Sequence, residues 1–215
     1  MSHFLQTQRH PATHTRLRRL AVISLVSMSS CITACSGSAA LQRLQYDFGL
    51  PTSASTTTAQ STLQIGLADI QVTPALDSNA MWYRLQYDNA QQLKTYAQAR
   101  WSMPPAQLLT QRFKIRLLAN GTQILSTGNA LTYQSVLHIE IDEFSQIFTT
   151  TSASHAQISL RAVLTKGKAI VAQRSFEAQF PCQTADAAGG ARAMQEASDI
   201  LSRDIQQWLT QLAAT

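Results

Sequence analysis

The chain has 215 residues, with 17 Lys or Arg against 12 Asp or Glu, which gives a formal net charge of +5. Its first 34 residues hold four of the basic side chains and no acidic ones, so residues 35–215 carry 17 − 4 = 13 basic and 12 acidic residues, a net charge of +1. A nearly neutral body gives no electrostatic case for binding nucleic acid. The remaining length, about 180 residues, is enough for one well-packed domain.

Residues 1–34 are built like a secretory signal peptide. Arginines precede a short, mostly apolar run over residues 20–34, which is too short to span a membrane. The run ends at Ile32-Thr33-Ala34-Cys35, which resembles the lipobox of bacterial lipoproteins, whose cysteine is acylated. We therefore expect residues 1–34 to be removed and Cys35 to carry acyl chains that hold the protein on a membrane outside the cytoplasm.

Two alternatives to this anchor stay open. Cys31 is a second candidate for acylation, although Met28-Ser29-Ser30 makes a poorer lipobox, and an ordinary signal peptide with a chance cysteine is the other. Ser36 stands after the cysteine where an aspartate would favour the inner membrane, so resemblance to sorted lipoproteins favours the outer membrane. With Cys35 acylated, only Cys182 remains in the mature chain, which excludes an intramolecular disulfide.

The first part of the mature chain predicts a tether, a strand, a loop and a buried strand. The tether covers residues 35–43, and the eight residues after the cysteine span at most about 28 Å, which keeps the body close to its membrane. Residues 44–50 alternate between apolar and polar types, typical of a half-buried strand. Residues 51–62 are rich in Ser, Thr and Ala and predict a flexible loop, whereas residues 63–72 are almost continuously apolar and predict a strand buried on both faces.

A hairpin and a helix are predicted next. Residues 81–87 and 93–97 have strand character and flank a turn at residues 88–91. For the helix we expect Ser102 as the N-cap, Pro104-Pro105 in the first turn and a stop at Asn120-Gly121. Its apolar stripe consists of Leu109, Phe113 and Leu117.

Three strands and a long helix complete the pattern. The strands cover residues 133–148, the alternating segment around 158–164, and residues 170–180 after a turn at Lys166-Gly167-Lys168. The final helix starts near Asp186 or after Gly189-Gly190, and its apolar stripe runs through Met194, Ala197, Leu201, Ile205, Trp208 and Leu212. Residues 44–215 are thus expected to form a single α/β domain, a two-layer sandwich in which two main helices pack on a mixed sheet. In it, the strands at residues 63–72 and 133–148 would pair in parallel through a helical crossover.

The pattern predicts no catalytic group, metal site or cofactor. His138, Glu140 and Asp142 share one strand face, but the outer two lie about 13 Å apart, too far to hold one zinc ion. We expect them on a solvated face, where the acidic groups meet Arg161 or Lys166. The motifs of serine hydrolases, zinc peptidases and phosphate-binding loops are missing from the sequence.

Aromatic residues are the better candidates for function. Trp82 and Tyr83 are neighbours on a predicted strand and must face opposite sides, and Trp101 precedes the first helix. Aromatic side chains dominate the energetics of protein interfaces, so Trp82, Tyr83 and Trp101 are our candidate partner-binding residues. Trp208 lies on the helical stripe and is expected in the core.

Beyond single residues, the chain resembles the ABC-type transport auxiliary lipoproteins over about residues 44–213. The resemblance depends on the order and spacing of several short segments. They are the lipobox at Cys35, the alternating Tyr46-Phe48-Leu50, the runs at residues 81–85 and 96–105, Leu108-Leu109, the run at residues 144–148, Leu160-Arg161-Ala162, Arg174-Ser175-Phe176 and the terminal helix with Trp208.

The resemblance implies a function that composition does not give. Such lipoproteins accompany ABC transporters whose mammalian-cell-entry (Mce) domain proteins move lipid across the cell envelope. It implies a non-enzymatic lipoprotein on the outer membrane that faces the periplasm and binds an Mce-domain protein; a homo-oligomer is an open alternative for its assembly. The rival hypotheses are a scaffold lipoprotein that assists assembly of an outer-membrane protein, and a periplasmic hydrolase.

Overall fold

The computed structural model describes residues 43–50, 63–125 and 135–214. The predicted signal peptide, Cys35, nearly all of the tether and the loop at residues 51–62 lie outside these ranges. Among the described residues, no helix is both long enough and apolar enough to cross a membrane.

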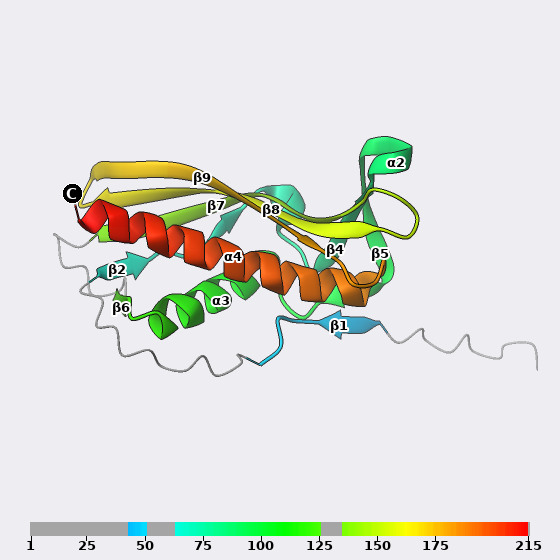
Figure 1. The fold of residues 1–215 in the computed structure, drawn as a ribbon, viewed down its shortest axis with the longest axis horizontal. Coiled ribbons are helices and arrows are strands. Elements are labelled where there is room, and N and C mark those ends of the chain that lie inside the picture. Colours follow the sequence, from blue (N-terminus) through cyan, green and yellow to red (C-terminus); the bar gives the residue numbers. More distant parts are fainter. Residues whose placement is uncertain (1–42, 51–62, 126–134, 215) are drawn as a thin grey trace, which may run out of the picture. The chain divides into compact units, whose positions relative to one another are not determined.

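The described residues form a mixed sheet of nine strands with two long helices, α3 and α4, on one face (Figure 1). This confirms the predicted α/β domain. The strands are β1 (Leu44–Tyr46), β2 (Gln64–Leu67), β3 (Gln71–Val72), β4 (Ala80–Leu85), β5 (Ala90–Trp101), β6 (Gln123–Leu125), β7 (Ser135–Phe148), β8 (Ser154–Lys166) and β9 (Ala169–Pro181). The helices are the 3₁₀ turn η1 (Pro74–Leu76), the short α2 (Gln86–Asn89), α3 (Pro105–Ala119) and α4 (Ala187–Ala213).

The long strand β7 organises the sheet. One of its edges pairs with antiparallel β8 along the whole strand, and β9 pairs with the far edge of β8. The other edge of β7 pairs in parallel with β2, β3 and β4 in turn. Beyond these, β6 adds to β2, while β5 and then β1 add to β4. The parallel β2–β7 pair confirms the expected crossover arrangement.

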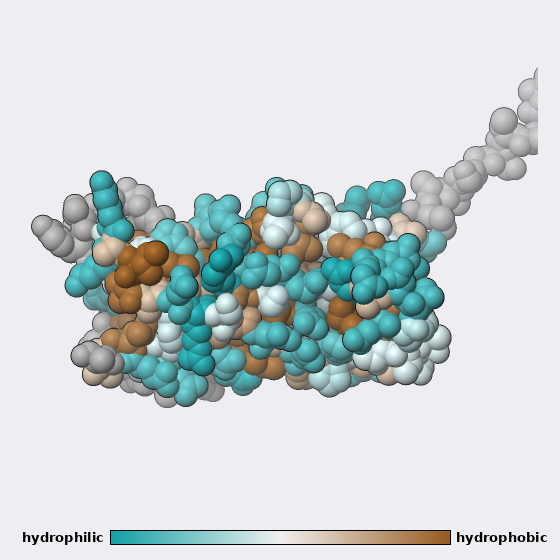
Figure 2. Space-filling view, turned by 90° about the horizontal axis from the view of Figure 1, so that it is seen from above, coloured by the Kyte–Doolittle hydropathy of each residue, from teal (hydrophilic) through white to brown (hydrophobic). Residues whose placement is uncertain are grey.

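Period-two patterning explains which side of β7 and β8 meets the helices. Leu137, Ile139 and Ile141 are at most 2% exposed. On β8, Leu160 pairs with Ile141 and Ile158 pairs with Phe144, and both are equally buried. The alternate residues His138, Glu140 and Asp142 are exposed, as predicted. Figure 2 looks down on the side where α2 and β9 lie in Figure 1, and shows a mostly hydrophilic surface with separate hydrophobic patches.

The first predicted helix is α3, but its cap differs from the expectation. Pro104 occupies the N-cap position and Pro105 the first turn, with no side-chain cap hydrogen bond. The prediction of Ser102 as N-cap is therefore wrong, because Ser102 lies two residues before the cap; its backbone N–H instead donates to the carbonyl oxygen of Tyr46 (2.8 Å). Gly121 has φ 88°, a left-handed conformation that ends the helix as expected.

Helix α4 follows its prediction closely. Asp186 is the N-cap, and its carboxylate accepts a hydrogen bond from the Gly189 N–H (2.7 Å). The predicted stripe is buried against the sheet through Trp208, whose ring meets Phe176 of β9 edge to face at 5.7 Å. Only Leu212, at the end of the stripe, is partly buried.

Three predicted elements are modified. The strand at residues 44–50 ends at Tyr46, and Leu44 and Leu50 are 55% and 91% exposed, because this segment pairs only with β5 and leaves the sheet after three residues. The strand at residues 63–72 is divided into β2 and β3. The β4–β5 hairpin is confirmed, with α2 in place of a simple turn.

Candidate functional site

Trp101 lies in the core, not on the surface. Its side chain is 2% exposed and is held between the rings of Phe48 (5.8 Å) and Phe144 (5.6 Å). The prediction of Trp101 as a partner-binding residue is thus wrong for this structure, because a partner cannot reach the ring. The end of β5 therefore presents this ring to the hydrophobic core.

Trp82 and Tyr83 point to opposite sides of β4, as expected, and both are partly buried. The Tyr83 ring contacts those of Tyr96 (4.8 Å) and Phe148 (5.7 Å). Trp82 packs in part against the core, and its indole N–H is buried without an acceptor among the described residues. Neither ring is fully presented to solvent, and their role in partner binding stays a prediction.

A buried polar cluster lies beneath the first turn of α4. The Tyr96 hydroxyl donates to Gln146 Oε1 (2.9 Å), and Gln146 Nε2 donates to Ser154 Oγ (2.8 Å). A Cβ at Gly190 would overlap the Gln146 side chain, so the glycine lets the helix approach the sheet. The Gly189-Gly190 pair was the one signal of this contact in the sequence. The cluster is a packing device between α4 and the sheet.

Two ionisable groups at this cluster, the Tyr96 phenol and the Cys182 thiol, are kept neutral. Burial is the main cause that raises the pKa of the Tyr96 phenol, and the negative charge of Asp186 raises it further. Burial also raises the pKa of the Cys182 thiol, and this effect outweighs its hydrogen bond with Ser154. At neutral pH neither group is an anion, so the cluster lacks the activated nucleophile that covalent catalysis needs.

A second buried cluster joins α3 to α4 through charge. Asp199 of α4 accepts from Arg112 Nε (2.6 Å) and Nη2 (2.7 Å), and also from Arg116. Burial alone would raise the pKa of Asp199, but the hydrogen bonds and charges of the two arginines outweigh it and hold that pKa below its usual range. Arg112 is only 3% exposed. Sequence reasoning missed this cluster, whose only local signal is an arginine beside the apolar stripe of α3.

The strand residues considered for metal binding behave as a solvated ladder. Glu140 forms an ion pair with Arg161 of β8 at 3.0 Å, and both side chains are about half exposed. His138 Nε2 lies 3.3 Å from Thr165 Oγ1. Within the ranges that the structure covers, no group of three or more His, Cys, Asp or Glu side chains is arranged to hold a metal ion.

The outer face of the sheet carries a polar groove beneath the β4–β5 hairpin. Its volume is about 420 Å³, and it holds an ion pair between Arg84 and Glu143 at 3.1 Å. The remaining lining is mainly amide and imidazole groups. The lining residues are Arg84, Gln86, Ala90, Glu143, Ile147, His155, Gln157 and Gln179.

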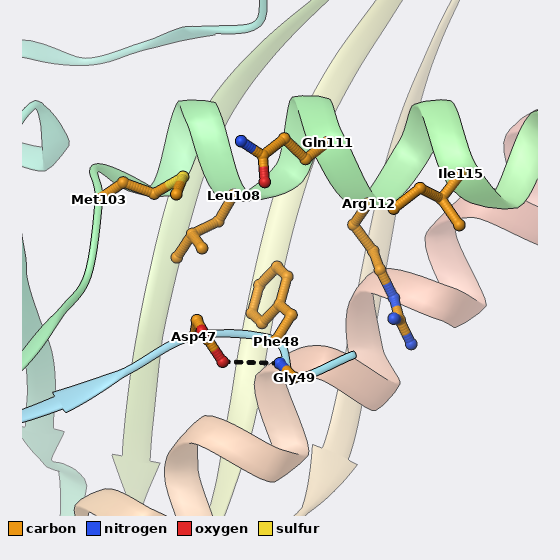
Figure 3. Close-up of a pocket in the computed structure, with 8 residues that line it drawn as sticks. All are labelled: Asp47, Phe48, Gly49, Met103, Leu108, Gln111, Arg112 and Ile115. Atoms are coloured by element: carbon orange, nitrogen blue, oxygen red, sulfur yellow. Dashed lines mark hydrogen bonds between the residues drawn. The ribbon is translucent and has the colours of Figure 1, made fainter. Parts of the chain in front are cut away.

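A smaller cleft of about 100 Å³ lies between α3 and the segment that follows β1 (Figure 3). The Asp47 carboxylate accepts from the Gly49 N–H (2.8 Å) and shapes that segment. Arg112, the one cation in the wall, is already bound to Asp199. The cleft therefore suits a small apolar group. Its lining is Asp47, Phe48, Gly49, Met103, Leu108, Gln111, Arg112 and Ile115.

The third hollow follows the edge of β9. Within the described residues this 13-residue strand pairs only with β8, so its other edge offers unpaired backbone groups. A cavity of about 370 Å³ lies beside it, lined by Arg174 and Phe176 of β9 and by Asp204, Gln207, Trp208 and Gln211 of α4. A strand edge next to a helix is the geometry that accepts an extended peptide, whose backbone pairs with the strand while its side chains enter the groove.

The described residues thus form one α/β domain whose surface carries three hollows. The family model described as "ABC-type transport auxiliary lipoprotein component" matches residues 46–206. The chain belongs to this family, which confirms the resemblance seen in the sequence. Its members are lipoproteins that serve as an auxiliary component of ABC-type transport.

Solved structures show the same fold. Protein XCC0632 from Xanthomonas campestris, of family DUF330, superposes with a TM-score of 0.66 at 19% identity, over 79% of this chain and 96% of that one. An uncharacterized protein superposes with a TM-score of 0.59 at 15% identity, over 77% and 97% of the two chains. At these identities the likeness concerns the fold alone. No curated protein sequence matches the chain.

Proposed function

We propose that this protein is an outer-membrane lipoprotein, anchored through acylated Cys35 and facing the periplasm, that acts as the non-catalytic auxiliary component of an Mce-domain lipid transport system. The observation that carries the proposal is the family match over residues 46–206. The lipobox that ends at Cys35 and the serine after it support the anchor and its location. The neutral Cys182 and Tyr96 and the ladder contacts of Glu140 support a role without catalysis.

The partner is an Mce-domain protein, and the edge of β9 is the docking surface that we favour. Most β9 side chains are exposed, which leaves room for an added strand. Arg174 and Asp204 lie on opposite walls of the adjoining groove, so each sign of charge is available to polar side chains of an extended segment. Trp82 and Tyr83 of β4 form the second candidate surface.

The proposal is tested by purifying the lipidated protein from its own envelope after cross-linking and identifying what is bound to it. We expect to identify an Mce-domain protein. Its recovery should fall at least about tenfold in an Arg174→Ala, Asp204→Ala double variant, because the variant loses both charged groups of the groove. A tenfold loss of affinity corresponds to about 1.4 kcal/mol of binding free energy. The matched control is Glu140→Ala with Arg161→Ala, a pair on the outer face.

Two outcomes would count against the proposal. Recovery of an outer-membrane barrel protein in place of an Mce-domain protein would favour the scaffold function. Loss of lipid-barrier function in His138→Ala, with partner binding and melting temperature unchanged, would favour an enzyme.

A further inference from the structure

The solvent-facing stripe of α3 carries two large aliphatic side chains. Ile115 is 39% and Leu118 53% exposed, one helical turn apart. Such residues normally lie on the buried side of a helix that packs on a sheet. The helix has no acidic residue between Pro105 and Ala119. The exposed stripe consists of Gln107, Gln111, Lys114, Ile115 and Leu118.

The segment that follows β1 adds a third aliphatic residue to the same side. Gly49 lines one cleft with Ile115 (Figure 3), and the next residue, Leu50, is 91% exposed. Leu50, Ile115 and Leu118, together with Lys114, are called the α3 face below. Exposed large apolar groups gathered on one side of a protein mark a surface that contacts something else.

The charge around the α3 face is small. Arg112 and Arg116 are bound to Asp199, and the negative charge of Glu196 also raises the pKa of Arg116. Lys114 adds one exposed positive charge, and Asp47 at the cleft adds a negative one. The contact that this face makes must therefore rest on apolar groups, with little help from electrostatic attraction.

Position along the chain identifies the occupant. Residues 43–50, which carry Leu50, are the first described residues after the tether, and Arg43 is only eight residues from Cys35. Those eight residues span at most about 28 Å. A domain tethered so closely meets the bilayer at high effective concentration, so a weak apolar contact from one of its surfaces suffices.

We propose that the α3 face rests on the lipid surface, with Leu50, Ile115 and Leu118 in the interfacial region and Lys114 among the headgroups. This inference depends on the proposed anchor at Cys35. In this orientation the helical layer lies next to the membrane, and the sheet lies on the far side of the helices. Interfacial binding of this kind scales with the buried apolar area.

The test uses the lipidated full-length protein in vesicles of phosphatidylethanolamine and phosphatidylglycerol. In a Cys182→Ala background, a single cysteine replaces Leu118 and carries an environment-sensitive fluorophore. Val171→Cys is the matched control, because Val171 is a 51% exposed aliphatic residue near the β8–β9 turn. We expect spin-labelled lipid to quench the probe at position 118 at least about twofold more than the probe at position 171. Ile115→Cys repeats the measurement at a second position.

Flotation of the vesicles separates this inference from the anchor. If the wild type floats and the probes at positions 115 and 118 are quenched no more than the one at 171, the α3 face does not contact lipid and the inference is wrong. If the wild type does not float, the anchor fails, and the inference fails with it. Unchanged melting temperatures show that the labelled variants are folded.

Discussion

Asp199 shows how single residues connect the helical layer. Its carboxylate lies between Arg112 and Arg116, so one acidic group of α4 holds two basic groups of α3 in a largely apolar interface. A buried charge of this kind is tolerated only while its partners are present, because removal of one partner leaves the others desolvated and unpaired.

We therefore expect Asp199→Asn to destabilise the protein strongly. The change removes the charge that Arg112 needs, and breaking a buried ion pair typically costs about 3–5 kcal/mol. Denaturant unfolding of the folded domain measures the loss. Glu140→Gln breaks the exposed pair with Arg161 and should cost less than about 1 kcal/mol. Equal losses in the two variants would contradict the importance of the cluster.

Acid should destabilise the protein through the same carboxylates. The pKa of Asp199 is held low by its arginines, and that of Asp186 by hydrogen bonds from the Gly189 N–H and the Thr184 hydroxyl. A carboxyl whose folded pKa lies below its unfolded value of about 3.9 stabilises the fold above that value, and the contribution is lost as the pH falls through the folded pKa. Unfolding titrations below about pH 4 should show this loss, and it should be smaller in Asp199→Asn.

At the scale of elements, the periodicity of apolar residues predicts which face of a strand or helix is buried. The alternation in β7 and β8 and the stripe of α4 are both buried as predicted, because each follows from one element facing one core. The break between β2 and β3, the bulge after Ile141 and helix α2 depend on neighbouring strands and could not be predicted in this way. Trp101 was misplaced for the same reason: the tertiary fold decides which face the end of β5 presents.

The contact between α4 and the sheet gives a prediction at this scale. Gly190→Ala should destabilise the protein by about 1–3 kcal/mol, since the added methyl group overlaps Gln146 in a packed interface. In a Gln146→Ala background the same change should cost less, because the obstructing side chain is gone. A double-mutant cycle measures this coupling. Additive effects would show that Gly190 and Gln146 do not interact.

At the scale of the whole molecule, the edge strands of the sheet differ in length. In the part of the chain that the structure describes, strand β9 leaves a long open edge, whereas the other outer strands, β1 and β6, have three residues each. Long open edges are uncommon in monomeric proteins, because they invite pairing with other chains. This inequality is the structural reason to expect a partner along β9.

Amide hydrogen exchange should report that edge directly. Strand β8 is paired along both edges, so its amides should exchange slowly. In β9 every second N–H faces the open edge and should exchange much faster than its neighbours. If the proposed Mce-domain partner docks on this edge, its addition should slow these amides. If all β9 amides exchanged slowly in the protein without a partner, the edge would already be covered.

The central position of β7 in the sheet also constrains the order in which the protein folds. Strands β2, β3 and β4 are made early but pair with β7; Gly66, for example, pairs with Val136, 136 − 66 = 70 residues later. Parallel pairings across such separations form slowly. Strands β2 and β4 can pair early with β6 and β5, but their pairing with β7, and the pairing of β3, must wait until residue 148 has followed. On the proposed route of export, a chain whose β7 has not yet followed exposes these strand edges and should depend on periplasmic chaperones until β7 arrives.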